Sequence, residues 1–114
     1  MVTILGQDNL IHNIESFTLD TTPRSILLLG GRGSGKHLIV DYLSKHLKLS
    51  TIDITDSLDK DNIDSIYLSV EPHIYMIDGT KISIKEQNII LKFVEEPLKN
   101  SYIVIMAENK SQLL

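Results

Sequence analysis

A glycine-rich run in the first third of the chain has the residue types and spacing that phosphate binding requires. Gly30 is followed, after four intervening residues, by Gly35 and Lys36, which is the spacing of a phosphate-binding loop. Glycines let backbone N–H groups point inward around an anion, because no side chain blocks the approach. The lysine adds a point charge for the outer phosphates. The predicted phosphate-binding residues are Gly30, Gly31, Arg32, Gly33, Ser34, Gly35, Lys36 and His37.

The last of these residues departs from the pattern. A phosphate-binding loop usually ends in Ser or Thr, whose hydroxyl ligates Mg²⁺, but position 37 is histidine. Imidazole suits transition metals rather than Mg²⁺. The sequence therefore predicts an intact phosphate cradle that has lost a metal ligand. The alternative interpretation is a glycine-rich turn that binds nothing.

An aspartate further along the chain is a candidate for the same site. Asp78 ends an apolar run over residues 73–77, where an aspartate can hold a magnesium-bound water facing phosphates. We therefore take it as the candidate magnesium-side acid, although Asp-Gly pairs are also common turns. ATP hydrolysis further needs a group that activates water, and Gly79 has no side chain. The pattern favours nucleotide binding without turnover.

Alternating strands and helices are predicted to position these residues. A capping-box pattern, Ser83 and Glu86, opens one helix, and a second helix is expected to be capped near Asp61 or Asn62. Further helices are expected from residues 8 and 36, and strands over residues 26–29, 49–54, 73–77 and 102–106. This alternation is typical of a three-layer αβα fold with a parallel sheet. Ligands of such sheets bind at the carboxyl ends of the strands, where the glycine-rich loop, Asp78 and Asn109 should converge.

Composition narrows the class of protein. The 114 residues suffice for one domain, and the formal net charge of −4 offers no basic field for autonomous nucleic-acid binding. The chain has no cysteine, which excludes disulfides and thiol catalysis. No apolar run approaches transmembrane length, and the N-terminus does not resemble a signal peptide. We therefore expect a cytoplasmic protein without a membrane partner.

Several segments together resemble a known family. In order and spacing they are similar to the AAA+ module of clamp-loader subunits, of the DNA polymerase III delta-prime or gamma/tau type. The segments are Gly6-Gln7 and residues 29–36, 75–78, 88–97 and 107–109. Residues 91–97, with the sequence Leu-Lys-Phe-Val-Glu-Glu-Pro, are the most specific of them.

The resemblance implies a fold and a function. The fold would be a P-loop NTPase (AAA+) core over residues 1–114, truncated before the fifth strand, with lid and collar domains absent. The function would be that of a clamp-loader-like subunit in DNA replication, accessory to a DNA-directed DNA polymerase holoenzyme. It would bind ATP or ADP weakly or without hydrolysis, with Asn109 as a polar sensor near the outer phosphate. Expected partners are other clamp-loader subunits, the sliding clamp and primed DNA through the assembly, with Glu95 and Glu96 near a neighbouring subunit.

Two questions stay open at the level of the sequence. Without a fifth strand, the strand over residues 26–29 would have a free edge, which we predict is covered by a partner, by a neighbouring molecule in a crystal or by the N-terminal segment. The acidic pair Glu95-Glu96 is explained equally well by ion pairs with Lys99 and Lys92. The alternative functions are an active P-loop ATPase or nucleotide kinase, and a scaffold with a vestigial loop. A kinase needs an arginine-rich acceptor site, which two arginines in the whole chain do not favour.

Overall fold

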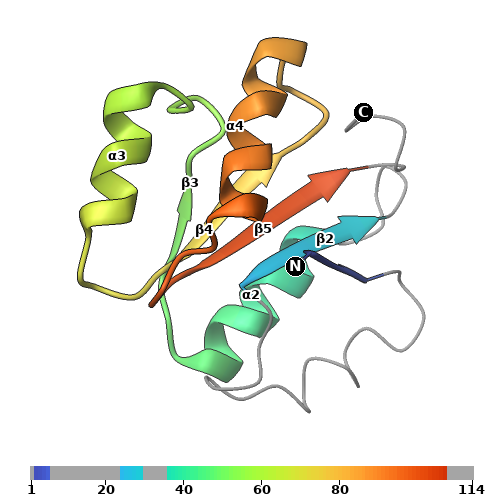
Figure 1. Ribbon diagram of the computed structural model, residues 1–114. Helices are drawn as coiled ribbons and strands as arrows, with labels where there is room; N and C mark the ends of the chain where they lie inside the picture. The colour runs from blue at the N-terminus through green and yellow to red at the C-terminus, as the bar shows by residue number, and fades with distance from the viewer. Residues whose placement is uncertain (1, 6–23, 30–35, 108–114) are drawn as a thin grey trace.

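The computed structural model describes residues 2–5, 24–29 and 36–107. Within these residues, five strands form one parallel sheet in the order β1-β2-β5-β4-β3 (Figure 1). The strands are β1 (Val2–Leu5), β2 (Ser25–Leu29), β3 (Thr51–Asp53), β4 (Ile74–Asp78) and β5 (Tyr102–Ala107). The helices are α2 (Lys36–Leu47), α3 (Lys60–Leu68) and α4 (Ile84–Glu95).

The helices cover both faces of the sheet (Figure 1). The chain runs from β2 to β3 in one direction across the sheet and returns through β4 to β5 in the other. Because such crossovers are right-handed, the two directions place their helices on opposite faces. Alternate residues of β2 accordingly enter different cores: Leu28 packs with α2, and Leu27 with α3 and α4. The predicted three-layer α/β organisation with a parallel sheet is confirmed.

β5 is the centre of the core. All six of its residues are buried, because α2 covers one face and α3 and α4 cover the other. A continuous apolar strand is what a parallel sheet buried on both faces requires. The predicted strand over residues 102–106 is therefore confirmed, and it extends by one residue to Ala107.

The N-terminal strand covers the edge that the sequence left open. β1 pairs in parallel with β2, with Val2 opposite Ser25 and Leu5 opposite Leu28. The prediction that this edge is covered is confirmed, and of the covers that the sequence left open it is the N-terminal segment that pairs with β2. The sheet thus has a fifth strand, although it comes from the beginning of the chain.

Local capping signals were partly right. The capping box of α4 is present, with the Ser83 side chain accepting from the Glu86 backbone and the Glu86 side chain from the Ser83 backbone. The cap of α3, expected near Asp61 or Asn62, is Asp59, which lies slightly earlier and accepts a 2.9 Å hydrogen bond from the Asn62 backbone N–H. The helix predicted from residue 8 lies outside the described residues.

Tyr67 ties α3 to α4 and gives a pH-dependent prediction. Its hydroxyl donates to the Glu96 carbonyl at 2.7 Å, and burial, with the charge of Glu96 as a second cause, raises the pKa of Tyr67 to about 12. Because the pKa is higher in the folded than in the unfolded state, this stabilisation is present below pH 10 and is lost toward pH 12. The substitution Tyr67→Phe should remove about 0.5–1.5 kcal/mol at pH 8.

The measurement is urea unfolding of both proteins at pH 8 and pH 11. The two unfolding midpoints should lie closer together at pH 11 than at pH 8, because the wild type alone loses the contribution of the Tyr67 hydroxyl. An unchanged difference between the midpoints would show that the pKa of Tyr67 is the same in the folded and the unfolded protein, contrary to the prediction.

Candidate functional site

Strands β2, β4 and β5 end at one edge of the sheet, and Asp78 lies there. In the register of the strands, Leu29 lies opposite Ala107 and Asp78 lies opposite Met106. The chain leaves β2 toward α2 on one face and leaves β4 toward α4 on the other, so the change of face falls across β5. A crevice at such a point is where open α/β sheets bind ligands. The glycine-rich residues 30–35 and Asn109 lie outside the described residues, whereas Lys36 begins α2.

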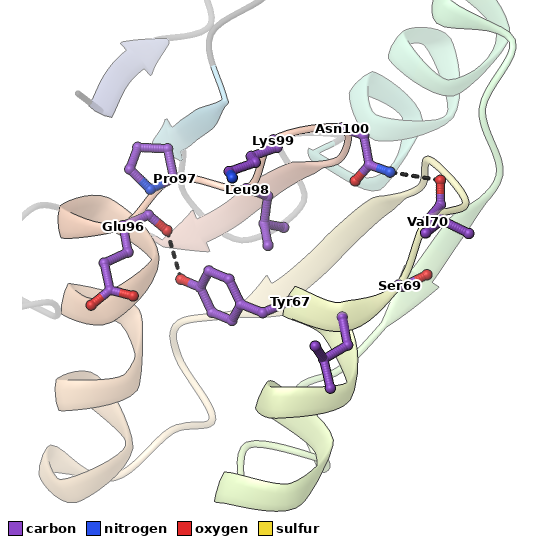
Figure 2. A pocket seen from close by; sticks show the side chains of 9 residues that line it. Tyr67, Ser69, Val70, Glu96, Pro97, Leu98, Lys99 and Asn100 are labelled. Atoms are coloured by element: carbon purple, nitrogen blue, oxygen red, sulfur yellow. Dashed lines mark hydrogen bonds between the residues drawn. The ribbon is translucent and has the colours of Figure 1, made fainter.

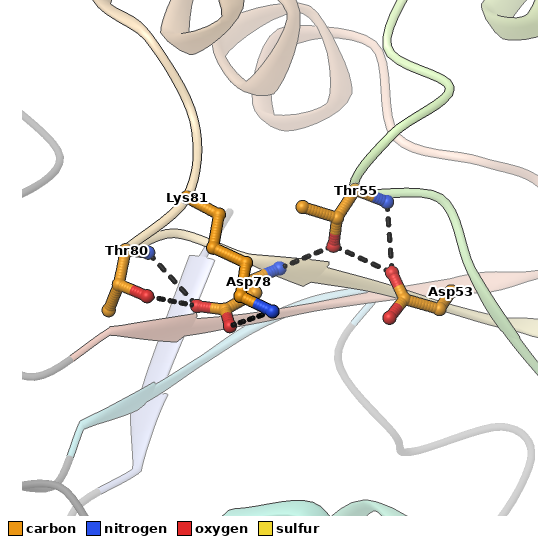
Figure 3. Close-up of polar contacts among 5 residues, drawn as sticks. All are labelled: Asp53, Thr55, Asp78, Thr80 and Lys81. Atoms are coloured by element: carbon orange, nitrogen blue, oxygen red, sulfur yellow. Dashed lines mark hydrogen bonds and ion pairs between the residues drawn. The ribbon is translucent and has the colours of Figure 1, made fainter.

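The carboxylate of Asp78 is held by the turn that follows it (Figure 3). Its Oδ1 atom accepts hydrogen bonds from the Thr80 backbone N–H at 3.0 Å and from the Thr80 hydroxyl at 2.7 Å. Its Oδ2 atom lies 3.9 Å from Lys81 Nζ. Both oxygens of this carboxylate therefore have partners within the chain.

A buried threonine links the ends of β3 and β4 (Figure 3). The ladder between the two strands is registered only as far as Asp53 and Met76, which leaves the Asp78 backbone N–H without a strand partner on that side. The Thr55 hydroxyl accepts this N–H at 2.9 Å and donates to Asp53 Oδ1 at 2.6 Å. Thr55 is 7% exposed, so the link is largely shielded from water.

The same local pattern holds both strand ends. In Asp53-Ile54-Thr55 and in Asp78-Gly79-Thr80, the aspartate Oδ1 accepts from both the backbone N–H and the hydroxyl of the threonine two residues later. This is an Asx-turn reinforced by a second hydrogen bond. Sequence reasoning missed Thr55, Thr80 and Lys81, and the repeated Asp-x-Thr spacing is the signal that could have revealed the two threonines.

The surroundings of the Asp78 carboxylate do not fit a bound Mg²⁺ ion. This ion requires nearly octahedral oxygen coordination, but the two lone pairs of Asp78 Oδ1 are already used by Thr80 and an ammonium group faces Oδ2. Position 37 contributes no hydroxyl. Among the described residues, no group of three or more His, Cys, Asp or Glu side chains could hold a metal. The role of Asp78 as a magnesium-side acid stays a prediction that its neighbours do not favour.

A groove lies at the opposite, amino edge of the sheet. Figure 2 shows it between the carboxyl ends of α3 and α4. Its volume is about 420 Å³. The Tyr67 hydroxyl closes one side on the Glu96 carbonyl, and the Asn100 amide donates to the Val70 carbonyl at 2.6 Å on the other. Leu68 and Val70 line the groove and are 81% and 85% exposed. The sequence analysis did not identify this groove.

The charges on α4 pair across the helices. Lys92 Nζ lies 3.8 Å from Asp64 Oδ1 of α3 and 5.1 Å from the Tyr67 ring centre. In the described part of the chain, the ion pair recorded for Lys92 is thus with Asp64 rather than with Glu96. Among the ion pairs of the described residues, neither of the two expected pairs, Glu96 with Lys92 and Glu95 with Lys99, is present.

The comparisons with known proteins do not assign the chain to a family, so its function has to be argued from the motifs and the geometry. No protein-family model matches the chain, and no curated protein matches it either. In the part of the chain that the structure describes, none of the helices has the length and apolar character needed to cross a membrane.

Proposed function

We propose that this chain is a nucleotide-binding AAA+ (P-loop) domain that acts as a clamp-loader-like subunit in DNA replication. The observation that carries the proposal is the placement of Leu29, Lys36 and Asp78. β2 ends at Leu29 on the edge where Asp78 ends β4, and α2 begins at Lys36 directly after the glycine-rich loop. A helix that starts there directs its positive end toward an anion in the loop.

The proposed site binds the phosphates of ATP or ADP without efficient hydrolysis. Backbone N–H groups of residues 30–35 would surround the phosphates, and Lys36 would add charge to the outer ones. The residue after Asp78 is glycine, and its N–H is used in a 2.7 Å hydrogen bond to the Met106 carbonyl. Gly79 therefore ties β4 to β5 and provides no group to activate water.

The amino edge supports a role in an assembly. Leu68 and Val70 are large apolar side chains that stand exposed beside the groove at the end of α3. Contiguous exposed apolar patches mark surfaces that bind another protein, and in this proposal Leu68 and Val70 form part of such a surface. The proposed partners are other clamp-loader subunits and the sliding clamp, with primed DNA bound through the assembly.

The proposal is tested by calorimetric titration with ATP, with and without Mg²⁺, on the wild type and on Lys36→Ala. We expect wild-type binding that Mg²⁺ scarcely improves, and loss of binding in Lys36→Ala, because the variant removes the charge that reaches the outer phosphates. The substitution Lys48→Ala is the matched control, since Lys48 is exposed and lies just beyond the end of α2.

The outcomes separate the alternatives. No heat with millimolar ATP in the wild type would contradict the proposal and favour a scaffold with a vestigial loop. Binding followed by steady release of phosphate would favour an active ATPase. Equal loss of binding in Lys36→Ala and Lys48→Ala would contradict the assignment of the loop.

A further inference from the structure

The groove at the amino edge of the sheet has apolar walls that hydrogen bonds hold in place (Figure 2). Leu68 and Val70 lie two residues apart on its rim, and Leu98, which is only 5% exposed, lines it from the side of the core. The Tyr67 hydroxyl and the Asn100 amide fix the two walls through backbone carbonyls. A preformed cleft of about 420 Å³ can take a few side chains of a partner at little cost in reorganisation.

The carboxyl ends of two helices meet at this groove. α3 ends at Leu68 and α4 at Glu95, and the carboxyl end of a helix carries about half a negative charge. The last turn of α2 contains the basic residues Lys45 and His46, whereas the last turn of α3 contains none. The ammonium group of Lys92, in the last turn of α4, is paired with a carboxylate of α3. The end of α3 therefore lacks the cation that a helix end of this kind favours.

Acidic side chains outnumber basic ones around the groove. Glu96 lines it, Glu95 precedes that residue and Glu71 follows the exposed apolar pair, and all three are exposed. Lys99 is the one basic residue of the lining. With His73 neutral, three carboxylates and one ammonium group leave a net charge of −2. Among the described residues, no ion pair is recorded for Glu95, Glu96 or Lys99, so these charges face the surroundings of the groove.

We propose that this groove binds a segment of another protein in which a lysine or arginine stands beside a large apolar side chain. The apolar side chain would pack on Leu68 and Val70, and the cation would lie at the end of α3 near Glu96. Like charges make a second copy of the chain a poor occupant, because two grooves of net negative charge repel each other. The inference rests on the proposed function only for the assignment of the amino edge to an assembly, and it requires no nucleotide.

The test is a selection from a random peptide library displayed on phage, with the full chain as the immobilised target. Peptides with a large apolar residue flanked by lysine or arginine should be enriched. The affinity of one enriched peptide is then measured by fluorescence anisotropy. Val70→Ser should weaken binding about five- to tenfold, because it removes apolar contact area. Glu96→Gln should weaken it about two- to fivefold at low ionic strength, and by less in high salt.

Each variant has a matched control. Ile84→Ser makes a similar change at an apolar side chain that is 82% exposed, at the opposite end of α4 from the groove. Asp41→Asn removes an exposed carboxylate on α2, which covers the other face of the sheet. Both controls should bind the peptide like the wild type. The variants Val70→Ser and Glu96→Gln keep the backbone carbonyls that accept from Asn100 and Tyr67, so the groove itself should persist.

The outcomes distinguish this inference from the proposed function. Enrichment of no peptides, or of acidic or uncharged ones, would overturn the inference, and so would equal losses of affinity in the variants and their controls. Sedimentation of the wild type as a dimer that Val70→Ser dissociates would also overturn it, since the occupant would then be a second copy. Failure of the wild type to bind ATP, with binding of the basic peptide intact, would overturn the proposed nucleotide site alone.

Discussion

Replacement of Phe93 by alanine is expected to lower the free energy of unfolding by about 3–5 kcal/mol. The Phe93 side chain is fully buried and belongs to the core that α3 and α4 form with the sheet. Its ring stacks on Tyr67, with a centroid distance of 5.5 Å and an interplanar angle of 12°. The alanine variant would lose the free energy that is gained by burying a large ring away from water. It would also leave a cavity between the helices. A typical domain has a free energy of unfolding of about 5–15 kcal/mol, so the expected loss is a large share of it.

The measurement is urea unfolding followed by circular dichroism, with Leu91→Ala as the matched control. Leu91 lies on the same helix and is 54% exposed, so its replacement should change the unfolding free energy by no more than about 0.5 kcal/mol. Similar losses for the two variants would show that α4 does not pack on the sheet in the way described. If Phe93→Ala fails to fold, Phe93→Leu should give a smaller loss in the same direction.

The parts of the fold that depend on local patterns were predictable. The strand over residues 102–106 is an apolar run bounded by polar residues, because β5 is buried on both faces. The capping box at Ser83 and Glu86 uses residues only three positions apart. That the edge of β2 is covered was predictable, since an open edge of this kind must be paired or shielded, but the sequence left open what covers it.

The parts that depend on choices among similar residues were not predictable. Several aspartates between Asp53 and Asp64 could each cap a helix, and the sequence does not say that Asp59 does so while Asp53 holds Thr55. The turn that Asp53 makes with Thr55 was equally hidden in the sequence. β3 therefore ends at Asp53, although the apolar pattern continues to Ile54. The groove between α3 and α4 depends on where two helix ends meet, which is a tertiary relation that neither helix encodes alone.

The candidate site was also predictable only in part. The types and spacing of Gly30, Gly35 and Lys36 predict a phosphate-binding loop that lies largely outside the described residues, whereas the strand that ends at Asp78 was predictable from its apolar run. The hydrogen bonds that hold Asp78 come from Thr55 and Thr80, on two different turns. Periodicity describes which residues are buried, but it does not describe which polar groups meet at the ends of strands.

The substitution Thr55→Val should destabilise the protein by about 1–3 kcal/mol, because it leaves a buried donor without a partner. Valine has nearly the shape of threonine, so the loss is one of hydrogen bonding rather than of packing. The Asp78 backbone N–H would lose its 2.9 Å acceptor, and Asp53 Oδ1 would lose the hydroxyl donor at 2.6 Å. The turn after β4 should therefore open more readily, and the Asp78 carboxylate should be held less firmly in its position.

Two measurements and two variants isolate this effect. Urea unfolding gives the loss of stability, and amide hydrogen exchange should show faster exchange at Asp78 than in the wild type. Thr55→Ser keeps the hydroxyl and should retain most of the protection of the Asp78 amide, whereas Thr51→Val makes the same chemical change on β3 and should leave that amide unaffected. Unchanged exchange at Asp78 in Thr55→Val would contradict the link between the two strand ends. A loss of protection confined to Asp78 and its turn would instead identify Thr55 as the residue that positions the carboxylate at the candidate site.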